Sequence, residues 1–287
     1  MTPVAPRLLS IAWRVSRFRF WIYTGGTYVV GYALGMDSWT AFFDPDYVLF
    51  LLYFFVPANV LIYGVNDWWD QETDRFNPKK DVKEYRMDEA DGRDLLLLLG
   101  VAAAISLVLL AALDTVGKAL LLFFLFLSYF YSAPPLRFKE VPFLDFSSNM
   151  LYVMPGILGY YLASGTLPPP ALLLAGYLHI AAMHLFSAIP DIGWDAAAGM
   201  RTTAVVLRER RSLLLCLGFW SGFAGLVIWL AGFNPLSLLV LVYPAIPLAL
   251  LLRESLSIDR VYWYLPYINT GLGGLVFLLA ALRTAVW

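Results

Sequence analysis

Nine long apolar runs separated by short polar segments constrain this chain more than any other feature of its sequence. A run of about 20 apolar residues is long enough to cross the hydrocarbon core of a membrane as an α-helix. Because lipid offers no partner for backbone N–H and C=O groups, only helices and closed barrels can span it. We therefore predict an all-α polytopic membrane bundle of about nine transmembrane helices, covering residues 18–35, 46–66, 95–113, 117–132, 147–164, 169–189, 213–231, 235–252 and 261–283.

The composition excludes an ordinary soluble domain. Hydrophobic residues make up 60% of the 287 residues and charged residues only 14%, whereas soluble domains carry about 25% charged residues. No soluble domain or low-complexity linker interrupts the runs, so we expect one membrane domain over residues 1–287, in contact with membrane lipid and not with nucleic acid. The single cysteine, Cys216, allows no disulfide within the chain and no cysteine-rich metal site.

Basic residues are divided unequally between the two sides of the predicted bundle. Of the 20 Lys and Arg residues, all except Lys118 and Arg283 fall in the N-terminal leader, at the start of the first run, or in the connections after the second, fourth, sixth and eighth runs. The positive-inside rule places those segments in the cytoplasm. We expect a protein of the cell membrane whose N-terminus and polar loops 66–94 and 191–212 lie on the cytoplasmic side.

The segment "NDWWDQETD", residues 66–74, places several oxygen-bearing side chains where the second apolar run ends. At about 100° per residue, Asn66, Asp67, Asp70 and Asp74 share one helix face, within an arc of about 100°. Like charges at helical spacing repel, and burying unpaired carboxylates at a membrane boundary is costly. A bound cation would offset both costs.

A second acidic segment, "DIGWD", repeats this pattern at the end of the sixth run, with Asp191 and Asp195 four residues apart. Pro190 fits the first turn of a new helical piece. Mg²⁺ prefers carboxylate oxygens and commonly completes its shell with substrate phosphate and water. Two such clusters on one side of the membrane favour a metal-bound diphosphate over surface acids paired with Lys and Arg. A cation-coupled transporter is an alternative of another class, although it would favour acids in mid-helix and these lie at helix ends.

These motifs resemble those of the UbiA superfamily of intramembrane prenyltransferases. "NDWWDQETD" matches the family's NDxxDxxxD motif, "DIGWD" matches its second DxxxD motif, and "YSAPPLRFK", residues 131–139, matches a YSxPP-type stretch. Within the superfamily, the chain most resembles carotenoid-modifying members, the lycopene elongases. The resemblance implies a nine-helix fold and transfer of an allylic isoprenoid from its diphosphate to a lipophilic acceptor. It also implies Mg²⁺ as the cofactor, with two ions bridging the diphosphate.

The resemblance further implies which side chains hold the metal and the diphosphate. They are the amide and the acids of the two motifs, Asn66, Asp67, Asp70, Asp74, Asp191 and Asp195. Among them Asp67 occupies a looser position of the family pattern. The following loop departs from the family, because many members have "NxPxRP" where this chain has "NPKKD". We therefore expect Lys79 or Lys80 to contact the diphosphate in place of an Arg.

Five further side chains are candidate substrate contacts. Arg137, Lys139 and Arg201 carry positive charge that can stabilise a leaving diphosphate, although the positive-inside rule alone also explains basic residues here. Tyr131 is a candidate to orient a phosphate oxygen or to face the allylic cation. His184 lies about two turns before the second motif and is either a cavity residue or a neutral, hydrogen-bonded histidine of its helix.

We predict a prenyltransferase that moves a dimethylallyl group to lycopene or a related carotenoid. The apolar spans beside the motifs contain no fixed cation for an acidic ring, whereas an extended polyene needs mainly apolar walls. A prenyltransferase with an aromatic or quinone-precursor acceptor is the alternative within the same class. After the terminal double bond of the polyene attacks, the resulting tertiary cation loses a proton or captures water.

Overall fold

The computed structural model describes residues 4–71, 91–253 and 255–286, and all regular structure in those ranges is helical. The α-helices there are α1 (Val4–Val15), α2 (Gly25–Gly35), α3 (Pro45–Phe55), α4 (Pro57–Trp69), α7 (Gly92–Ala112), α8 (Thr115–Phe130), α9 (Leu144–Ser147), α10 (Met154–Ser164), α11 (Pro170–Ala188), α12 (Ile192–Ala197), α13 (Thr203–Ala231), α14 (Val242–Leu252) and α15 (Ile258–Val286). Short 3₁₀ helices cover Phe18–Tyr23, Trp39–Phe43, Phe138–Glu140, Ser148–Tyr152, Ile189–Asp191 and Ser237–Leu241.

Every one of the nine predicted runs coincides with helix in the described ranges, so the predicted all-α membrane bundle is confirmed. Some runs consist of two pieces. In the second run, α3 and α4 are separated at Val56, because Pro57 has no N–H with which to continue the helical hydrogen bonds. Among the described residues, five helical stretches are long and apolar enough to cross a membrane, and two shorter apolar helices accompany them. The chain is an integral membrane protein.

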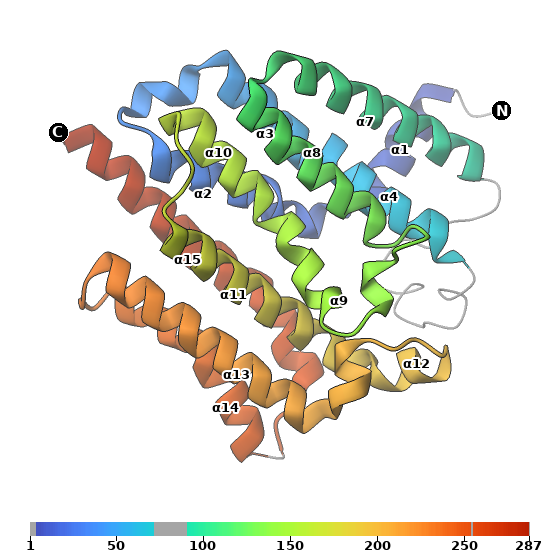
Figure 1. The fold of residues 1–287 in the computed structure, drawn as a ribbon, viewed down its shortest axis with the longest axis vertical. Coiled ribbons are helices and arrows are strands. Elements are labelled where there is room, and N and C mark those ends of the chain that lie inside the picture. Colours follow the sequence, from blue (N-terminus) through green and yellow to red (C-terminus); the bar gives the residue numbers. More distant parts are fainter. Residues whose placement is uncertain (1–3, 72–90, 254, 287) are drawn as a thin grey trace.

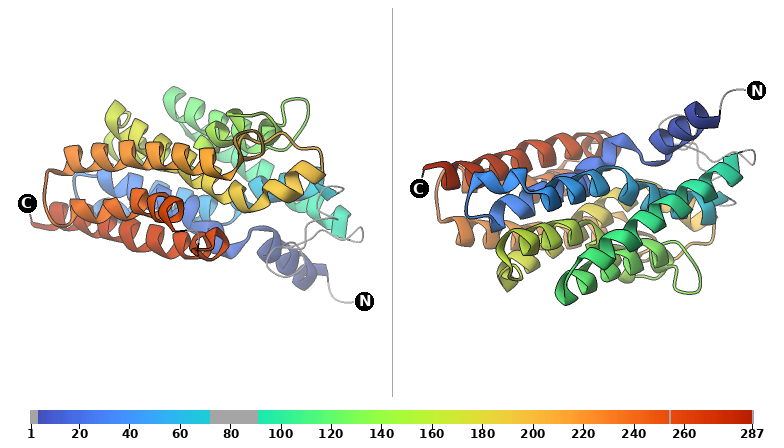
Figure 2. Two further views of the ribbon diagram at one scale, coloured as in Figure 1. Left: turned by 90° about the horizontal axis from the view of Figure 1, so that it is seen from below. Right: turned by 90° about the horizontal axis from the view of Figure 1, so that it is seen from above.

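The helices run alongside one another and bring the two termini to opposite ends of the bundle (Figure 1). The end of α4, the start of α7, α9 and α12 gather at the end where the N-terminus lies, at the right of Figure 1. We call this the motif end, because both acidic motifs lie there. Helix α1 lies to one side of the other helices at the motif end (Figure 2). The topology therefore places two motifs that are distant in sequence on one side of the bundle.

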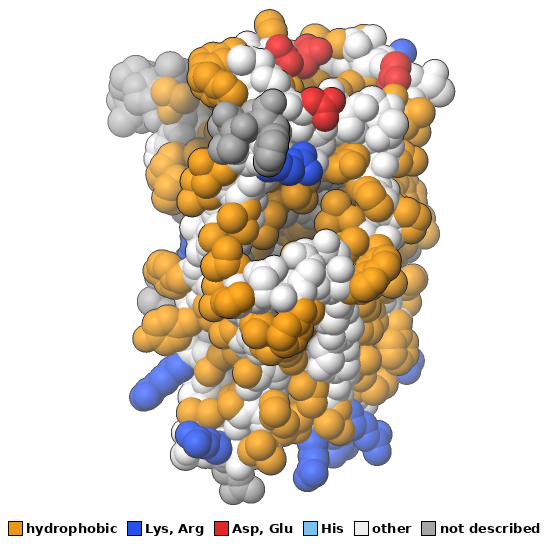
Figure 3. Space-filling view, turned by 90° about the vertical axis from the view of Figure 1, so that its left-hand side faces the viewer, with side chains coloured by type: hydrophobic (Ala, Val, Ile, Leu, Met, Phe, Trp, Pro, Cys, Tyr) orange, Lys and Arg blue, Asp and Glu red, His pale blue; other side chains and the backbone are white. Residues whose placement is uncertain are grey.

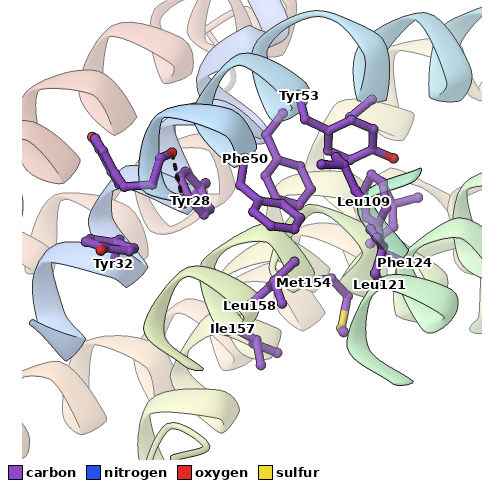
Figure 4. Close-up of a cluster of buried hydrophobic side chains, with 14 of the residues drawn as sticks. Tyr28, Tyr32, Phe50, Tyr53, Leu109, Leu121, Phe124, Met154, Ile157 and Leu158 are labelled. Atoms are coloured by element: carbon purple, nitrogen blue, oxygen red, sulfur yellow. Dashed lines mark hydrogen bonds between the residues drawn. The ribbon is translucent and has the colours of Figure 1, made fainter. Parts of the chain in front are cut away.

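Aromatic side chains fill the core between α2, α3, α7, α8 and α10 (Figure 4). Tyr28, Tyr53 and Phe124 are almost completely buried there. The buried phenols have hydrogen-bond partners, as a dry interior requires. Tyr28 donates to the carbonyl of Tyr47 at 3.1 Å, and the Tyr53 hydroxyl lies 2.8 Å from that of Ser106.

The outer surface is apolar over long stretches. Large hydrophobic side chains of α7 and α15 are exposed, among them Leu107, Val108 and Leu282. These exposed side chains suit contact with lipid, since polar groups in hydrocarbon are costly. Figure 3 views the molecule from the left-hand side of Figure 1, where hydrophobic side chains are spread over the face and charged side chains lie mainly near its upper and lower edges.

Glycines allow α2 and α10 to approach each other closely. A Cβ atom on Gly31 would lie 2.0 Å from the carbonyl oxygen of Gly156, and one on Gly35 would lie 2.6 Å from that of Tyr160. Both contacts are with backbone atoms, which cannot move aside as a flexible side chain can. Small residues are the usual means of such close packing in membranes.

We expect Gly31→Ala to destabilise the bundle, because the added methyl group must push α10 away from α2. Overpacking of this kind costs about 1–3 kcal/mol, and it should lower the temperature of thermal unfolding in detergent. The matched control is Gly218→Ala, an exposed position in α13 where no heavy atom lies within 4 Å of the new Cβ. Equal unfolding temperatures for the two variants would contradict the close contact.

Candidate active site

The first motif joins the end of α4 to the segment that follows α8. Helix α4 ends at Trp69, and Asp70 is its C-cap, with its N–H bonded to the carbonyl of Asn66. The Asn66 side-chain amide donates to Asp70 Oδ2 at 2.6 Å and to Ser132 Oγ at 2.9 Å. Asp70 is only 4% exposed. The helical spacing predicted from the sequence thus brings Asn66 and Asp70 into direct contact.

Two basic side chains lie against the carboxylate of Asp70. Lys139 forms an ion pair with Asp70 Oδ1, and Arg137 Nη2 is 3.6 Å from the same oxygen. Arg137 also pairs with Glu140 at 2.6 Å. The backbone of Arg137 is left-handed, with φ 38°, a conformation that costs energy for a residue with a Cβ. The segment turns at this residue, so that both predicted phosphate contacts meet the first motif.

Asp67 pairs with Arg17, at the junction between α1 and the first span. Arg17 Nη2 donates to Asp67 Oδ1 at 2.7 Å, and Asp67 is 2% exposed. The guanidinium of Arg17 also lies over the ring of Tyr63, 4.7 Å from its centroid. The sequence analysis did not predict this ion pair. An arginine beside an apolar run, with a carboxylate at the end of another, is the signal that indicates such a pair.

The second motif begins where α11 ends. Asp191 closes the 3₁₀ helix Ile189–Asp191, Asp195 lies in α12, and both side chains are partly buried. The new helical piece begins beside Pro190, as the sequence predicted. Thr202 Oγ1 donates to Asp195 Oδ2 at 3.5 Å and accepts from the N–H of Val205, so the same hydroxyl caps α13.

A pocket of about 640 Å³ lies beside the second motif, between α12 and the first residues of α13 and α15. Most of its lining is apolar: Ile189, Pro190, Ile192, Gly193, Ala196, Val205, Arg208, Glu209 and Ile258. Arg208 has left-handed φ, 63°, and kinks α13 at the edge of this pocket. The pocket gives an apolar surface at the motif end, of a size typical of sites for small lipophilic molecules.

Sequence reasoning missed a buried carboxylate, Asp145, which connects α9 to the start of α13. Its two oxygens accept from the N–H of Thr203 at 2.6 Å, the hydroxyl of Thr203 at 2.5 Å and the N–H of Phe146 at 2.8 Å. Asp145 is 1% exposed. Thr203 directly follows Thr202, whose hydroxyl donates to Asp195. The contact between Asp145 and Thr203 therefore helps to position the second motif. The signal in the sequence is a lone acid among apolar residues in "VPFLDF".

Tyr131 and His184 meet in the interior, between the two motifs. Their rings form an edge-to-face pair with centroids 6.0 Å apart. Two predicted substrate contacts, Tyr131 after α8 and His184 of α11, therefore lie side by side.

The structure thus groups Asn66, Asp70, Arg137 and Lys139, and it separately pairs Asp195 with Thr202. Arg201 is exposed between α12 and α13. Asp74, Lys79 and Lys80 lie outside the described residues. Within the described ranges, no three His, Cys, Asp or Glu side chains lie close enough to hold a metal ion. The donors of the two motifs are nevertheless all oxygens, the set that fits Mg²⁺ and not zinc.

Comparison with known proteins gives relatives along nearly the whole chain. It is 40% identical over 286 residues to a lycopene elongase/hydratase of Haloarcula japonica, covering 98% of this chain and 94% of that protein. It is 39% identical over 268 residues to a lycopene elongase/hydratase of Halobacterium salinarum, covering 93% and 95%.

Solved structures give the same fold. A UbiA homolog from Archaeoglobus fulgidus, bound to GPP and Mg²⁺, superposes with a TM-score of 0.69 at 21% identity, covering 92% of this chain and 98% of that one. Residues 24–262 match the UbiA prenyltransferase family. This chain therefore belongs to the UbiA family of prenyltransferases.

Proposed function

We propose that the chain is a Mg²⁺-dependent enzyme that transfers a dimethylallyl group from its diphosphate to lycopene or a related carotenoid. The observation that carries the proposal is the cluster at the end of α4, where Asn66 and Asp70 meet Arg137 and Lys139. A carboxylate with an adjacent amide suits a metal ion, and the adjacent cations suit a phosphate. The lycopene elongase/hydratase relatives and the neighbours bound to DMAPP or GPP with Mg²⁺ support the same chemistry.

In this proposal the two motifs together would hold two Mg²⁺ ions and the diphosphate. The ligands would be Asn66, Asp70 and Asp74 of the first motif, and Asp191 and Asp195 of the second. Bound Mg²⁺ would neutralise the diphosphate and make it a better leaving group. For Asp67, the ion pair with Arg17 favours a supporting role, in which it holds the start of the first span against α4.

The basic side chains stabilise negative charge as the diphosphate departs. We assign this role to Arg137 and Lys139, which already lie beside Asp70, and to Arg201 in the loop after the second motif. Lys79 and Lys80, outside the described residues, remain proposed contacts of the same kind.

We propose that the allylic group extends inward from the first motif past the ring pair of Tyr131 and His184. The face of an aromatic ring attracts a cation, so we assign Tyr131 the stabilisation of the allylic cation. His184 supports the ring from the side of α11. The terminal double bond of the polyene then attacks the allylic carbon, which forms the new carbon–carbon bond.

An apolar acceptor fits the surroundings of the motifs. The stretch 48–65, which leads into the first motif, contains no Lys, Arg, Asp or Glu. An acidic aromatic acceptor would need a fixed cation in the cavity. Membership of a prenyltransferase family removes the transporter alternative. We further propose that the chain acts as one domain over residues 1–287, with the motif end in the cytoplasm.

We expect Asp70→Asn and Asp191→Asn each to reduce Mg²⁺-dependent diphosphate release by more than tenfold, because each removes a charge from the metal site. A tenfold loss corresponds to about 1.4 kcal/mol of transition-state stabilisation. The measurement is diphosphate release by purified protein, with Asp37→Asn, an exposed acid at the other end of the bundle, as the control. Retention of more than about a tenth of the activity by either variant would remove that residue from the metal site.

The proposed orientation predicts which loops a membrane-impermeant thiol reagent can reach. Native Cys216 is completely buried and should give no background. A cysteine at exposed Arg93, at the motif end, should react only from the cytoplasmic side, and one at exposed Thr166 only from the outside. The measurement is labelling of intact cells and of inverted vesicles. The reverse pattern would place the motif end outside the cell.

The acceptor can be tested by direct competition. Given dimethylallyl diphosphate and Mg²⁺, the purified enzyme should elongate lycopene and leave 4-hydroxybenzoate unchanged, since the uncharged stretch 48–65 beside the first motif supplies no partner for a carboxylate. Product analysis by chromatography and mass spectrometry separates the two outcomes. Prenylated hydroxybenzoate with intact lycopene would refute the carotenoid acceptor and leave the metal mechanism in place.

A further inference from the structure

Polar side chains from several spans meet in the interior of the bundle, away from both acidic motifs. Asn269 of α15 accepts a hydrogen bond from the Tyr243 hydroxyl of α14 at 2.7 Å. Its amide donates to the Tyr23 hydroxyl, which precedes α2, at 3.4 Å, and to the sulfur of Met183 in α11 at 3.6 Å. Tyr243 is 3% exposed and Met183 6%. We call Tyr23, Asn269, Tyr243 and His179 the interior polar cluster.

His179 completes this cluster from α11. Its ring centroid lies 4.7 Å from that of Tyr243 and 4.7 Å from that of Phe223. Its Nδ1 is buried, and among the described residues it has no hydrogen-bond partner. In the tautomer that carries its proton on Nε2, this nitrogen is an acceptor available to a small molecule. Both His179 and Asn269 keep part of their surface accessible.

The cluster is connected to the first motif by tyrosines. The Tyr152 ring packs edge-to-face on Tyr23 with centroids 6.2 Å apart, and its hydroxyl donates to that of Tyr63 at 3.2 Å. Tyr63 is one helical turn before Asn66 in α4. His179 is five residues before His184, or about 7.5 Å deeper along α11. His179 therefore lies deeper in the bundle than the Tyr131–His184 ring pair.

This arrangement differs from a contact that joins only two spans, such as the hydrogen bond between Tyr53 and Ser106. Here one amide contacts three other segments, and a ring nitrogen of a neighbouring histidine is left without a partner. Polar groups within membrane spans are costly, and when retained they mark functional sites.

We propose that the interior polar cluster holds the water molecule that captures the tertiary cation, so that the elongated product carries a hydroxyl group. This inference rests on the proposed function. The carbon–oxygen bond to diphosphate breaks and leaves the allylic cation. The polyene double bond attacks that cation, which forms the new carbon–carbon bond and leaves a tertiary cation on the polyene. The water oxygen donates an electron pair to that carbon, which forms a carbon–oxygen bond. One proton of the water passes to Nδ1 of His179.

The members of the cluster then have different roles. His179 accepts the proton, and its ring is held in place by Tyr243 and Phe223. Asn269 and the Tyr243 hydroxyl orient the water toward the cation. If no water is held there, the same cation loses a proton from an adjacent carbon and gives an alkene. The cluster therefore controls the ratio of hydroxylated to alkene product and does not affect release of diphosphate.

The test compares His179→Phe and Tyr243→Phe with the wild type. Each purified protein is given lycopene, dimethylallyl diphosphate and Mg²⁺ in ¹⁸O-labelled water. Diphosphate release, lycopene consumption and the ratio of ¹⁸O-hydroxylated to alkene product are measured separately. His179→Phe keeps a ring of similar size, and Tyr243→Phe removes only one hydroxyl. The control, Tyr53→Phe, removes a buried hydroxyl that also joins two spans but lies outside the cluster.

We expect the ratio of hydroxylated to alkene product to fall by about tenfold or more in His179→Phe, because proton transfer by a positioned side chain contributes about 10²–10⁴-fold to such steps. The ratio should also fall in Tyr243→Phe, which loses a hydroxyl that orients the water. Diphosphate release should stay close to the wild-type rate, and Tyr53→Phe should keep the wild-type ratio.

An unchanged ratio in both cluster variants, or equal loss of both products, would overturn the proposal. So would a wild-type product without a hydroxyl group. A wild type that releases diphosphate but leaves lycopene unchanged would instead refute the proposed acceptor, and the inference with it.

Discussion

The absence of water from the hydrocarbon core is the constraint on which this structure depends. Backbone groups must be satisfied within each segment, so the spans are helices, and charged side chains must lie at helix ends or pair with one another. The acidic motifs therefore occur where α4 and α11 end. An enzyme that brings a charged diphosphate to a lipid-dissolved hydrocarbon needs such a boundary, because the charged and apolar parts of its substrates meet there.

Three carboxylates at the motif end are buried in three different ways. Asp70 lies against Lys139 and Arg137, Asp67 pairs with Arg17, and Asp145 accepts hydrogen bonds from Thr203 and Phe146. Hydrogen bonds to an ionised group are roughly twice as strong as those between neutral groups. The arrangement of Asp70 differs from the other two in function, since its cations can also stabilise a phosphate. Asp67 and Asp145 instead connect the motifs to the rest of the bundle.

The interior contains a second kind of polar chemistry, which is neutral. Tyr23, His179, Tyr243 and Asn269 carry no fixed charge in the region between spans, where a fixed charge would be very costly. Neutral groups of this kind suit a water molecule or a hydroxyl group, and they do not suit an acidic ring. The charged end and the neutral interior thus match the two parts of the proposed reaction, departure of diphosphate and capture of the remaining cation.

The sequence by itself determined the helices, their approximate limits and the contact between Asn66 and Asp70. Apolar length and the spacing of residues along one helix are local properties, and they are read directly from the chain. The roles of Arg137 and Lys139 were also predicted, although their contact with Asp70 requires the left-handed turn at Arg137. Only the tertiary structure decided the remaining partners, because they are remote in sequence. Arg17 and Asp67 are 50 residues apart, Asp145 and Thr203 are 58 apart, and Tyr23 and Asn269 are 246 apart. Such pairs depend on how the helices pack. Between α2 and α10, close packing depends on Gly31 and Gly35, which lie against the backbone of α10.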